Sequence, residues 1–347
     1  MHPLLPVLGL VALVGFAVQR TDAPSVAEQF GPETPLQHVL LTLGDAAPDH
    51  LSARTADPEQ VRRGADLVLR GRTLGPDGGR TAAVSKHYVC TNCHNLDRED
   101  PDLTVSDPEA RLPYVRERGL PLLQGSTLWG VVNRERWYND DYVRKYGAAR
   151  IADARARLRA AVELCAVECA QGRPLAAWEA DAILTYLWTL EYTLADLELS
   201  ANEYARLNAD RTRPDAHPRL IDWLKTHYLQ KSPAHFYEAP ADKRTGYAGL
   251  TGDPDAGRAV YESSCLHCHQ PKNGVSHYAL DNQTLSFRDL RRTLFKNSHF
   301  SLYQIIPYGT YALPGHRPYM PHFPAERMSR QQVEDLRAYV ERRASEG

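Results

Sequence analysis

The sequence predicts an all-α protein with two helical domains in tandem. Asp253-Pro254 places an N-cap residue before a proline at the first helical position. A capping box at Ser329–Gln332 precedes apolar residues at helical spacing, so a second helix closes the same segment. The frame recurs earlier in the chain, where Asp57-Pro58 opens another helix. The segments around these signals lack the alternating apolar residues that are typical of strands.

Length and charge set the domain organisation and exclude some partners. A chain of 347 residues, 43% hydrophobic and 24% charged, is long enough for two cores. We expect an N-terminal extension at 23–56, a first domain at 57–199, a linker at 200–250 and a second domain at 251–347. The linker is polar and contains prolines, although Leu220–Tyr228 has a helical pattern. The net charge of −2 comes from interleaved charges and favours neither a nucleic-acid surface nor a polybasic membrane patch.

The first 22 residues are expected to direct export. They contain a largely apolar run from Leu4 to Val18, which is short for a membrane span but typical of the core of a signal peptide. Because the run is preceded by no lysine or arginine, an uncleaved N-terminal anchor stays open as the alternative. We therefore expect a periplasmic protein whose membrane contact is limited to that anchor.

The cysteines indicate the cofactor. Four of the six cysteines form two copies of C-x-x-C-H, the attachment signature of c-type haem. In this motif two cysteines one helical turn apart form thioethers to the haem vinyl groups, and the histidine becomes the proximal iron ligand. The sequence thus predicts two covalently attached haem c groups. Their residues are Cys90, Cys93 and His94 for the first haem, and Cys265, Cys268 and His269 for the second.

Three other interpretations of the motifs can be weighed. A thioredoxin-like redox pair would lie beside a βαβ unit, which the surrounding residues do not suggest. A structural disulfide would leave the repeated histidine unexplained. A zinc site could form from Cys90 and Cys93 with the remaining pair, Cys165 and Cys169, but the second motif has no further cysteine pair to complete such a site.

Residues 251–345 resemble class I cytochrome c. The matching features, in order, are a helix with Gly257 and Tyr261, the haem motif, a loop of sequence Met320-Pro-His-Phe323, and a closing helix with Tyr339. The resemblance implies that the first and last helices cross, with the glycine allowing close approach. It also implies that His269 and Met320 are the axial ligands of the second haem.

The residues around Met320 agree with that role. The methionine lies on a proline-rich loop, a rigid setting for holding a thioether against iron. Met328 is better explained as a packing residue at the start of the last helix. His316 and His322 are nearby alternatives as ligands.

The first domain repeats this frame with an insertion. Gly64 and Val68 take the places of Gly257 and Tyr261, and the glycine-rich stretch beginning at Gly71 predicts an inserted loop. The closing helix is predicted from Trp178 to Tyr192. Its apolar residues cover most of its circumference, which suggests burial on more than one side.

The distal ligand of the first haem is left open by the sequence. No methionine or histidine lies between His94 and Trp178. When Tyr186 is aligned with Tyr339, the position equivalent to Met320 is flanked by Cys165 and Cys169. These two cysteines could form a disulfide, or one could ligate the iron as a thiolate. The other candidates are Lys145, although a solvated lysine is the commoner case, an open site, or a distant histidine such as His38, His87 or His217.

The surroundings of the first haem motif leave two functions open, electron transfer and an oxidoreductase activity. Arg134 or Arg136 could pair with the haem propionates, or could receive a small anion beside an open iron. The stretch from Cys165 to Leu175 is similar to thiosulfate dehydrogenases and sulfur-oxidation cytochromes. We expect single-electron transfer with other periplasmic redox proteins as partners. The alternative is an oxidoreductase that acts on a small sulfur anion at the first haem.

Overall fold

The computed structural model confirms the all-α fold class. It describes residues 29–54, 57–272, 275, 279–310 and 320–346, and in these ranges the chain forms fourteen α-helices and no β-strand. The apolar N-terminal run and His316 lie outside the described residues. Within the described ranges, none of the helices has the length and apolar character that crossing a membrane requires.

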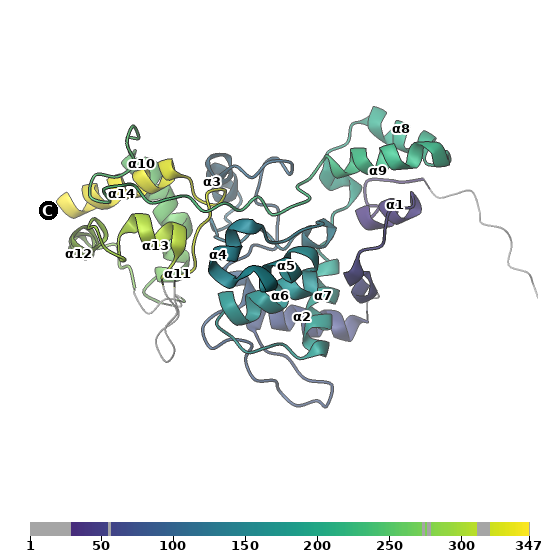
Figure 1. The fold of residues 1–347 in the computed structure, drawn as a ribbon, viewed down its shortest axis with the longest axis horizontal. Coiled ribbons are helices and arrows are strands. Elements are labelled where there is room, and N and C mark those ends of the chain that lie inside the picture. The colour runs from purple at the N-terminus through teal and green to yellow at the C-terminus, as the bar shows by residue number, and fades with distance from the viewer. Residues whose placement is uncertain (1–28, 55–56, 273–274, 276–278, 311–319, 347) are drawn as a thin grey trace, which may run out of the picture.

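The helices are joined by connections of very different length, and the longest ones precede α3, α4 and α10 (Figure 1). The N-terminal half contains α1 (Leu36–Thr42), α2 (Pro58–Arg70), α3 (Pro108–Glu117), α4 (Val143–Tyr146), α5 (Ala148–Ala156), α6 (Leu158–Leu164) and α7 (Ala177–Trp188). The C-terminal half contains α8 (Ala201–Asp210), α9 (His217–Lys225), α10 (Pro254–Val260), α11 (Leu266–His269), α12 (Thr284–Leu294), α13 (Leu302–Tyr308) and α14 (Arg330–Ser345). Two π-helical turns, Cys165–Cys169 and Tyr261–Cys265, extend α6 and α10.

Helices α2 and α7 form the frame of the first half. The Asp57 side chain caps α2 by accepting from the backbone N–H of Glu59, and Pro58 occupies the first helical position, as the sequence predicted. The helices touch at Gly64, where an added Cβ would overlap the backbone carbonyl of Ala182. The absence of a side chain at Gly64 therefore allows the two backbones to approach.

Helices α10 and α14 repeat this crossing in the second half. Asp253 caps α10, and the predicted capping box at Ser329 and Gln332 begins α14. A Cβ on Gly257 would overlap the carbonyl of Asp335 in α14. Next to this contact the rings of Tyr261 and Tyr339 lie 5.3 Å apart between centroids. The helix crossing implied by the cytochrome c resemblance is therefore present.

The segment predicted as a linker is partly helical. Helices α8 and α9 lie within 200–250, and their apolar residues share a separate hydrophobic cluster with α1. Figure 1 shows this group at one end of the molecule, away from α10–α14. From α9 the chain then runs to α10 without further helices among the described residues.

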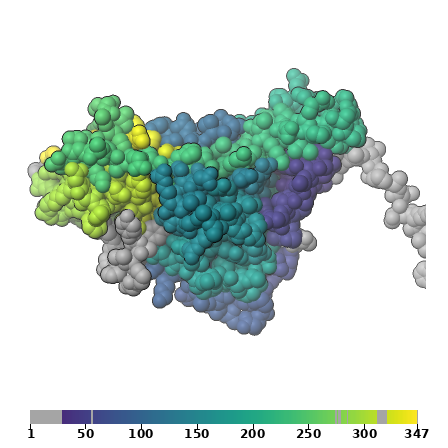
Figure 2. Space-filling view, viewed as in Figure 1, coloured from purple at the N-terminus to yellow at the C-terminus, as the bar shows by residue number. Residues whose placement is uncertain are grey.

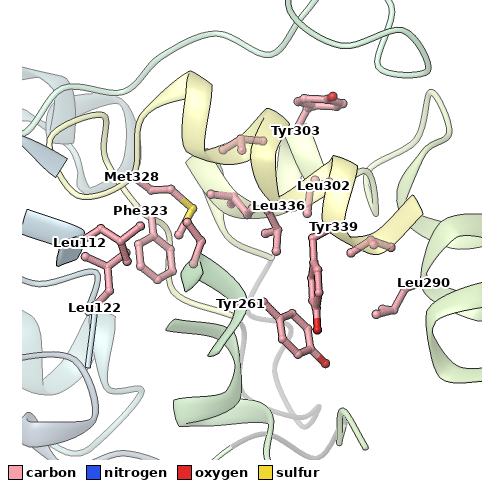
Figure 3. Close-up of a cluster of buried hydrophobic side chains, with 14 of the residues drawn as sticks. Leu112, Leu122, Tyr261, Leu290, Leu302, Tyr303, Phe323, Met328, Leu336 and Tyr339 are labelled. Atoms are coloured by element: carbon pink, nitrogen blue, oxygen red, sulfur yellow. The ribbon is translucent and has the colours of Figure 1, made fainter. Parts of the chain in front are cut away.

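Helix α3 lies within the range predicted for the first domain but packs into the core of the second half. Leu112 and Leu122 belong to the same buried cluster as Phe323 and Met328. Figure 3 shows these four side chains together, with the two leucines at the edge of the cluster. The two halves therefore share apolar packing.

A buried ion pair also joins the two halves, which lie against each other in the space-filling view (Figure 2). Arg327 donates to both carboxylate oxygens of Glu99, at 2.6 and 2.9 Å, and both side chains are almost completely buried. Nearby, the buried Arg111 donates to the backbone carbonyl of Glu326. Moving the halves apart would leave these buried charges without partners, and an unpaired buried charge is costly. The contacts therefore hold the halves in one relative position.

Candidate functional site

A cavity of about 230 Å³ lies in the first half, and the first C-x-x-C-H motif forms part of its wall. Cys90, Cys93 and His94 line it together with apolar residues of α2, α6 and α7. The motif itself is a short 3₁₀ turn at Cys90–Asn92, closed by hydrogen bonds from the N–H groups of Cys93 and His94 to the carbonyl of Cys90. The two cysteines and the histidine are thus held on one compact turn.

The imidazole of His94 is oriented by the loop that faces it. Its Nδ1 lies 2.6 Å from the carbonyl oxygen of Ser126, so Nδ1–H can donate there and Nε2 stays available as a ligand. Gly125 is required at this place, because a Cβ would overlap the ring of His94 and the carbonyl of Cys93. Burial lowers the pKa of His94, which favours the neutral form that binds metals.

Cys165 and Cys169 also line the first cavity, from the π-helical turn after α6. Both are free thiols in the structure. The Sγ of Cys169 lies 3.4 Å from the Tyr146 hydroxyl and 3.8 Å from the Tyr138 hydroxyl. Hydrogen bonds from the Cys165 thiol and from these hydroxyls outweigh burial and lower the pKa of Cys169 to about 6. The cavity therefore contains a thiol that favours the thiolate form at neutral pH.

His322 and Lys145 meet beside this thiol pair. The sequence offered His322 as an alternative ligand near Met320, but its side chain lines the first cavity and is absent from the lining of the second. Its Nδ1 is 2.8 Å from the Nζ of Lys145. The Lys145 side chain is exposed as a whole, yet its amine end faces the buried His322, and burial lowers its pKa to about 8.

The other sequence candidates do not line the first cavity. None of the three distant histidines, His38, His87 and His217, is part of its wall. Arg134 is part of the wall, whereas Arg136 is exposed and outside it. A guanidinium N–H of Arg134 donates to Ser126 Oγ at 3.0 Å, while its Nε is buried without a hydrogen-bond partner. An unpaired buried donor on the wall of this largely apolar cavity fits the carboxylate of a haem propionate.

The second cavity, of about 470 Å³, lies in the second half. Cys265, Cys268, His269 and Met320 all line it. Met320 is held by two hydrogen bonds with Thr310: its N–H donates to Thr310 Oγ1 at 2.7 Å, and its carbonyl accepts from Thr310 N–H at 3.1 Å. The predicted ligands of the second haem thus share one apolar cavity, a lining that fits a haem.

The geometry does not fit two of the alternatives to haem, a zinc site and a thioredoxin-like redox pair. Among the described residues, which include all six cysteines, no group of three or more His, Cys, Asp or Glu side chains lies close enough to hold a metal ion. The two cysteine pairs near the first cavity therefore do not offer the tetrahedral set that zinc requires. The motifs also do not adjoin a βαβ unit, because the described ranges contain no strand.

Sequence reasoning missed the loop that orients His94 and the ion pair that joins the halves. The only local signal for the loop was Gly125 followed by a serine. Glu99 and Arg327 gave no signal, since they are 228 residues apart. Their pairing depends on how the halves dock.

Comparison with known proteins identifies one segment of the chain, which contains α10–α13 and most of α14. Residues 252–340, about a quarter of the chain, match the family model for cytochrome c oxidase, cbb3-type, subunit III. No curated protein and no solved structure shows significant similarity to the chain. The family match covers the C-x-x-C-H motif, Met320 and the α10–α14 crossing, and it implies covalently bound haem c. Residues 252–340 of this chain therefore form a c-type cytochrome domain.

Proposed function

We propose that the chain is a periplasmic dihaem c-type cytochrome that carries single electrons between other redox proteins. The observation that carries this proposal is that each C-x-x-C-H motif lines an apolar cavity of its own. The cytochrome c domain at residues 252–340 supports haem-based electron transfer for the second cavity. The apolar run in the first 22 residues supports export to the periplasm, the compartment in which this proposal has the haem attached.

The residues of each cavity have separate tasks in this function. Bound haem would supply an iron that changes its charge by one electron. Cys90 and Cys93 would anchor the first haem, and His94, held by the Ser126 carbonyl, would present Nε2 to it. In the second cavity Met320, which is hydrogen-bonded to Thr310, would supply a thioether ligand, and such a ligand would raise the reduction potential relative to two nitrogen ligands.

Haem staining of denaturing gels tests the proposal. The full chain is expressed in a host that attaches haem c, alongside variants with alanine at Cys90 and Cys93, at Cys265 and Cys268, or at all four positions. We expect the band to keep about half of its stain in each paired variant and to lose it only in the fourfold variant. A Cys265/Cys268 variant that loses all of its stain would show that the first motif carries no haem.

A second candidate function is favoured by one observation, the thiol cluster of the first cavity. Cys165 and Cys169, with the hydroxyls of Tyr138 and Tyr146 and the amine of Lys145 nearby, offer a thiolate and cationic or hydrogen-bonding groups to a small sulfur anion. Under the carrier function, thiosulfate and tetrathionate cause no sustained turnover with an artificial electron acceptor or donor. Steady turnover that is lost in Cys169→Ser would instead support the oxidoreductase.

A further inference from the structure

The two cavities share part of their walls. Tyr88, Gln124 and Pro321 line both of them. Tyr88 lies two residues before Cys90, the first residue of the first motif. Pro321 lies between Met320 of the second cavity and His322 of the first, so one loop serves both. The cavities are therefore neighbours, separated by a few side chains.

A five-residue segment, 122–126, forms hydrogen bonds with residues in or next to both haem motifs. We call it the clamp segment. The N–H of Leu122 donates to the carbonyl of Ser263, two residues before Cys265, at 2.9 Å. The N–H of Gly125 donates to the carbonyl of Cys93, also at 2.9 Å. Since Ser126 accepts from His94 as described, the clamp segment holds the two haem motifs at a fixed separation.

A side chain of the shared wall contacts one cysteine of the first motif. Gln124, from the middle of the clamp segment, donates through Nε2 to the Sγ of Cys93 at 3.0 Å. Tyr88 and Gln124 line both cavities, so these two side chains lie between the first motif and the second cavity.

We propose that the two haems exchange electrons directly across this wall, with Tyr88 and Gln124 as the side chains that separate the two cavities. One electron would pass from a ferrous haem bound at one motif to a ferric haem bound at the other, and no bond would form or break. The inference rests on the proposed function, because it requires haem at both motifs. Glu99 and Arg327 support it by holding the halves together, so that the transfer needs no collision between tethered domains.

Flash photoreduction of the haem-loaded full chain tests the inference. A short pulse of a photoreduced flavin reduces a small fraction of the haem, and the following redistribution between the two haems is recorded optically. We expect a phase whose rate constant is independent of protein concentration and of solvent viscosity. A rate that rises with protein concentration would overturn the inference, because the electrons would then pass between molecules.

Substitutions test the two residues in the wall. Tyr88→Leu and Gln124→Leu are each expected to slow the redistribution several-fold, whereas Tyr204→Leu, in α8 and away from both cavities, leaves it unchanged. If both wall variants redistribute electrons at the wild-type rate, these side chains are not the path.

A measurement on the unsubstituted protein covers the case in which the wall variants fail to bind haem. In the oxidised protein the two ferric haems should speed each other's electron spin relaxation, compared with a Cys265→Ala/Cys268→Ala chain. Equal relaxation in both proteins would contradict the short separation. A haem-to-protein ratio of one, seen before any rate is measured, would instead overturn the proposed function and the inference with it.

Discussion

At the scale of single residues, the first cavity is where the sequence left the most choices. The alignment of Tyr186 with Tyr339 placed Cys165 and Cys169 opposite the first motif, and both lie on the cavity wall. Lys145 was one candidate ligand, with a solvated lysine as the commoner case; it is exposed as a whole, and its amine contacts His322. The sequence could not show this contact, because the two residues are 177 positions apart and meet only when the halves dock.

The thiol of Cys169 should be the most reactive one in the haem-loaded protein. The four motif cysteines are then expected to be thioethers, which leaves Cys165 and Cys169. Because hydrogen bonds lower the pKa of Cys169 to about 6, its alkylation by iodoacetamide should be fast at pH 7 and should decline as the pH falls below about 6. Cys165 has a strongly raised pKa and should react slowly. Peptide mass mapping, with Cys169→Ser as control, checks this; faster labelling of Cys165 would contradict it.

Met320 should determine the spectrum of the second haem. We expect Met320→Ala to abolish the sulfur-to-iron absorption band of the ferric protein and to lower the reduction potential of that haem. Met328→Leu is the matched control, because Met328 is buried in the core of the second half and leucine keeps its apolar contact with the second cavity. This control should keep the band and lose less than about 1.5 kcal/mol of stability. An unchanged band in Met320→Ala would reject Met320 as the ligand.

At the scale of elements, the helices were the part of the fold that the sequence predicted best. The caps at Asp57, Asp253 and Ser329 are local signals, and each begins a helix in the structure. The closing helix of the first half was predicted as Trp178–Tyr192 and is observed as Ala177–Trp188. Helix α3 and the clamp segment could not be assigned to their places, since their packing partners come from the other half of the chain.

The two glycines at the helix crossings give a prediction on stability. A methyl group at Gly64 would overlap the Ala182 carbonyl, and one at Gly257 would overlap the Asp335 carbonyl. We expect Gly64→Ala and Gly257→Ala each to lower the free energy of unfolding by about 1–3 kcal/mol, even though alanine favours helix. Gly31→Ala is the control, because open space surrounds Gly31. Urea unfolding followed by circular dichroism measures the differences, and a crossing variant as stable as the control would contradict the packing described here.

At the scale of the whole molecule, the buried Glu99–Arg327 pair makes the two halves depend on each other. Removing one partner leaves a buried charge, so Arg327→Met should cost about 3–5 kcal/mol. The double variant Glu99→Gln/Arg327→Met should recover part of this loss. Arg62→Gln, which breaks an exposed pair with Glu59, should cost far less, because water screens that pair. Equal, small losses for Arg327→Met and Arg62→Gln in urea unfolding would show that the halves are not joined in this way.

The same pair predicts how stability depends on pH. Burial alone would raise the pKa of Glu99, but the charge and hydrogen bonds of Arg327 lower it to about 2, below its ordinary value of 4.5. A carboxylate with a lowered pKa stabilises the folded state above its unfolded pKa, and this contribution is lost as the pH falls towards the folded value. The stability difference between the wild type and the double variant should therefore shift against the wild type between about pH 5 and 2. A difference that stays constant across this range would contradict the assignment.

The docked arrangement of the halves explains which features the sequence could predict. The haem motifs, the capped helices and the loop around Met320 depend on residues close together in the chain. The lining of the first cavity by His322 and the wall that contains Tyr88 and Gln124 combine residues from both halves. Local sequence patterns do not predict contacts between residues that are far apart in the chain.

The proposal of two haems in one chain is tested most directly by the ratio of haem to protein. The full chain is purified from a host that attaches haem c, its haem is quantified by the pyridine haemochrome spectrum, and its protein is quantified by amino-acid analysis. We predict two haems per chain, with one remaining after Cys90 and Cys93 are replaced and one after Cys265 and Cys268 are replaced. A ratio of one in the unsubstituted protein would contradict the proposal.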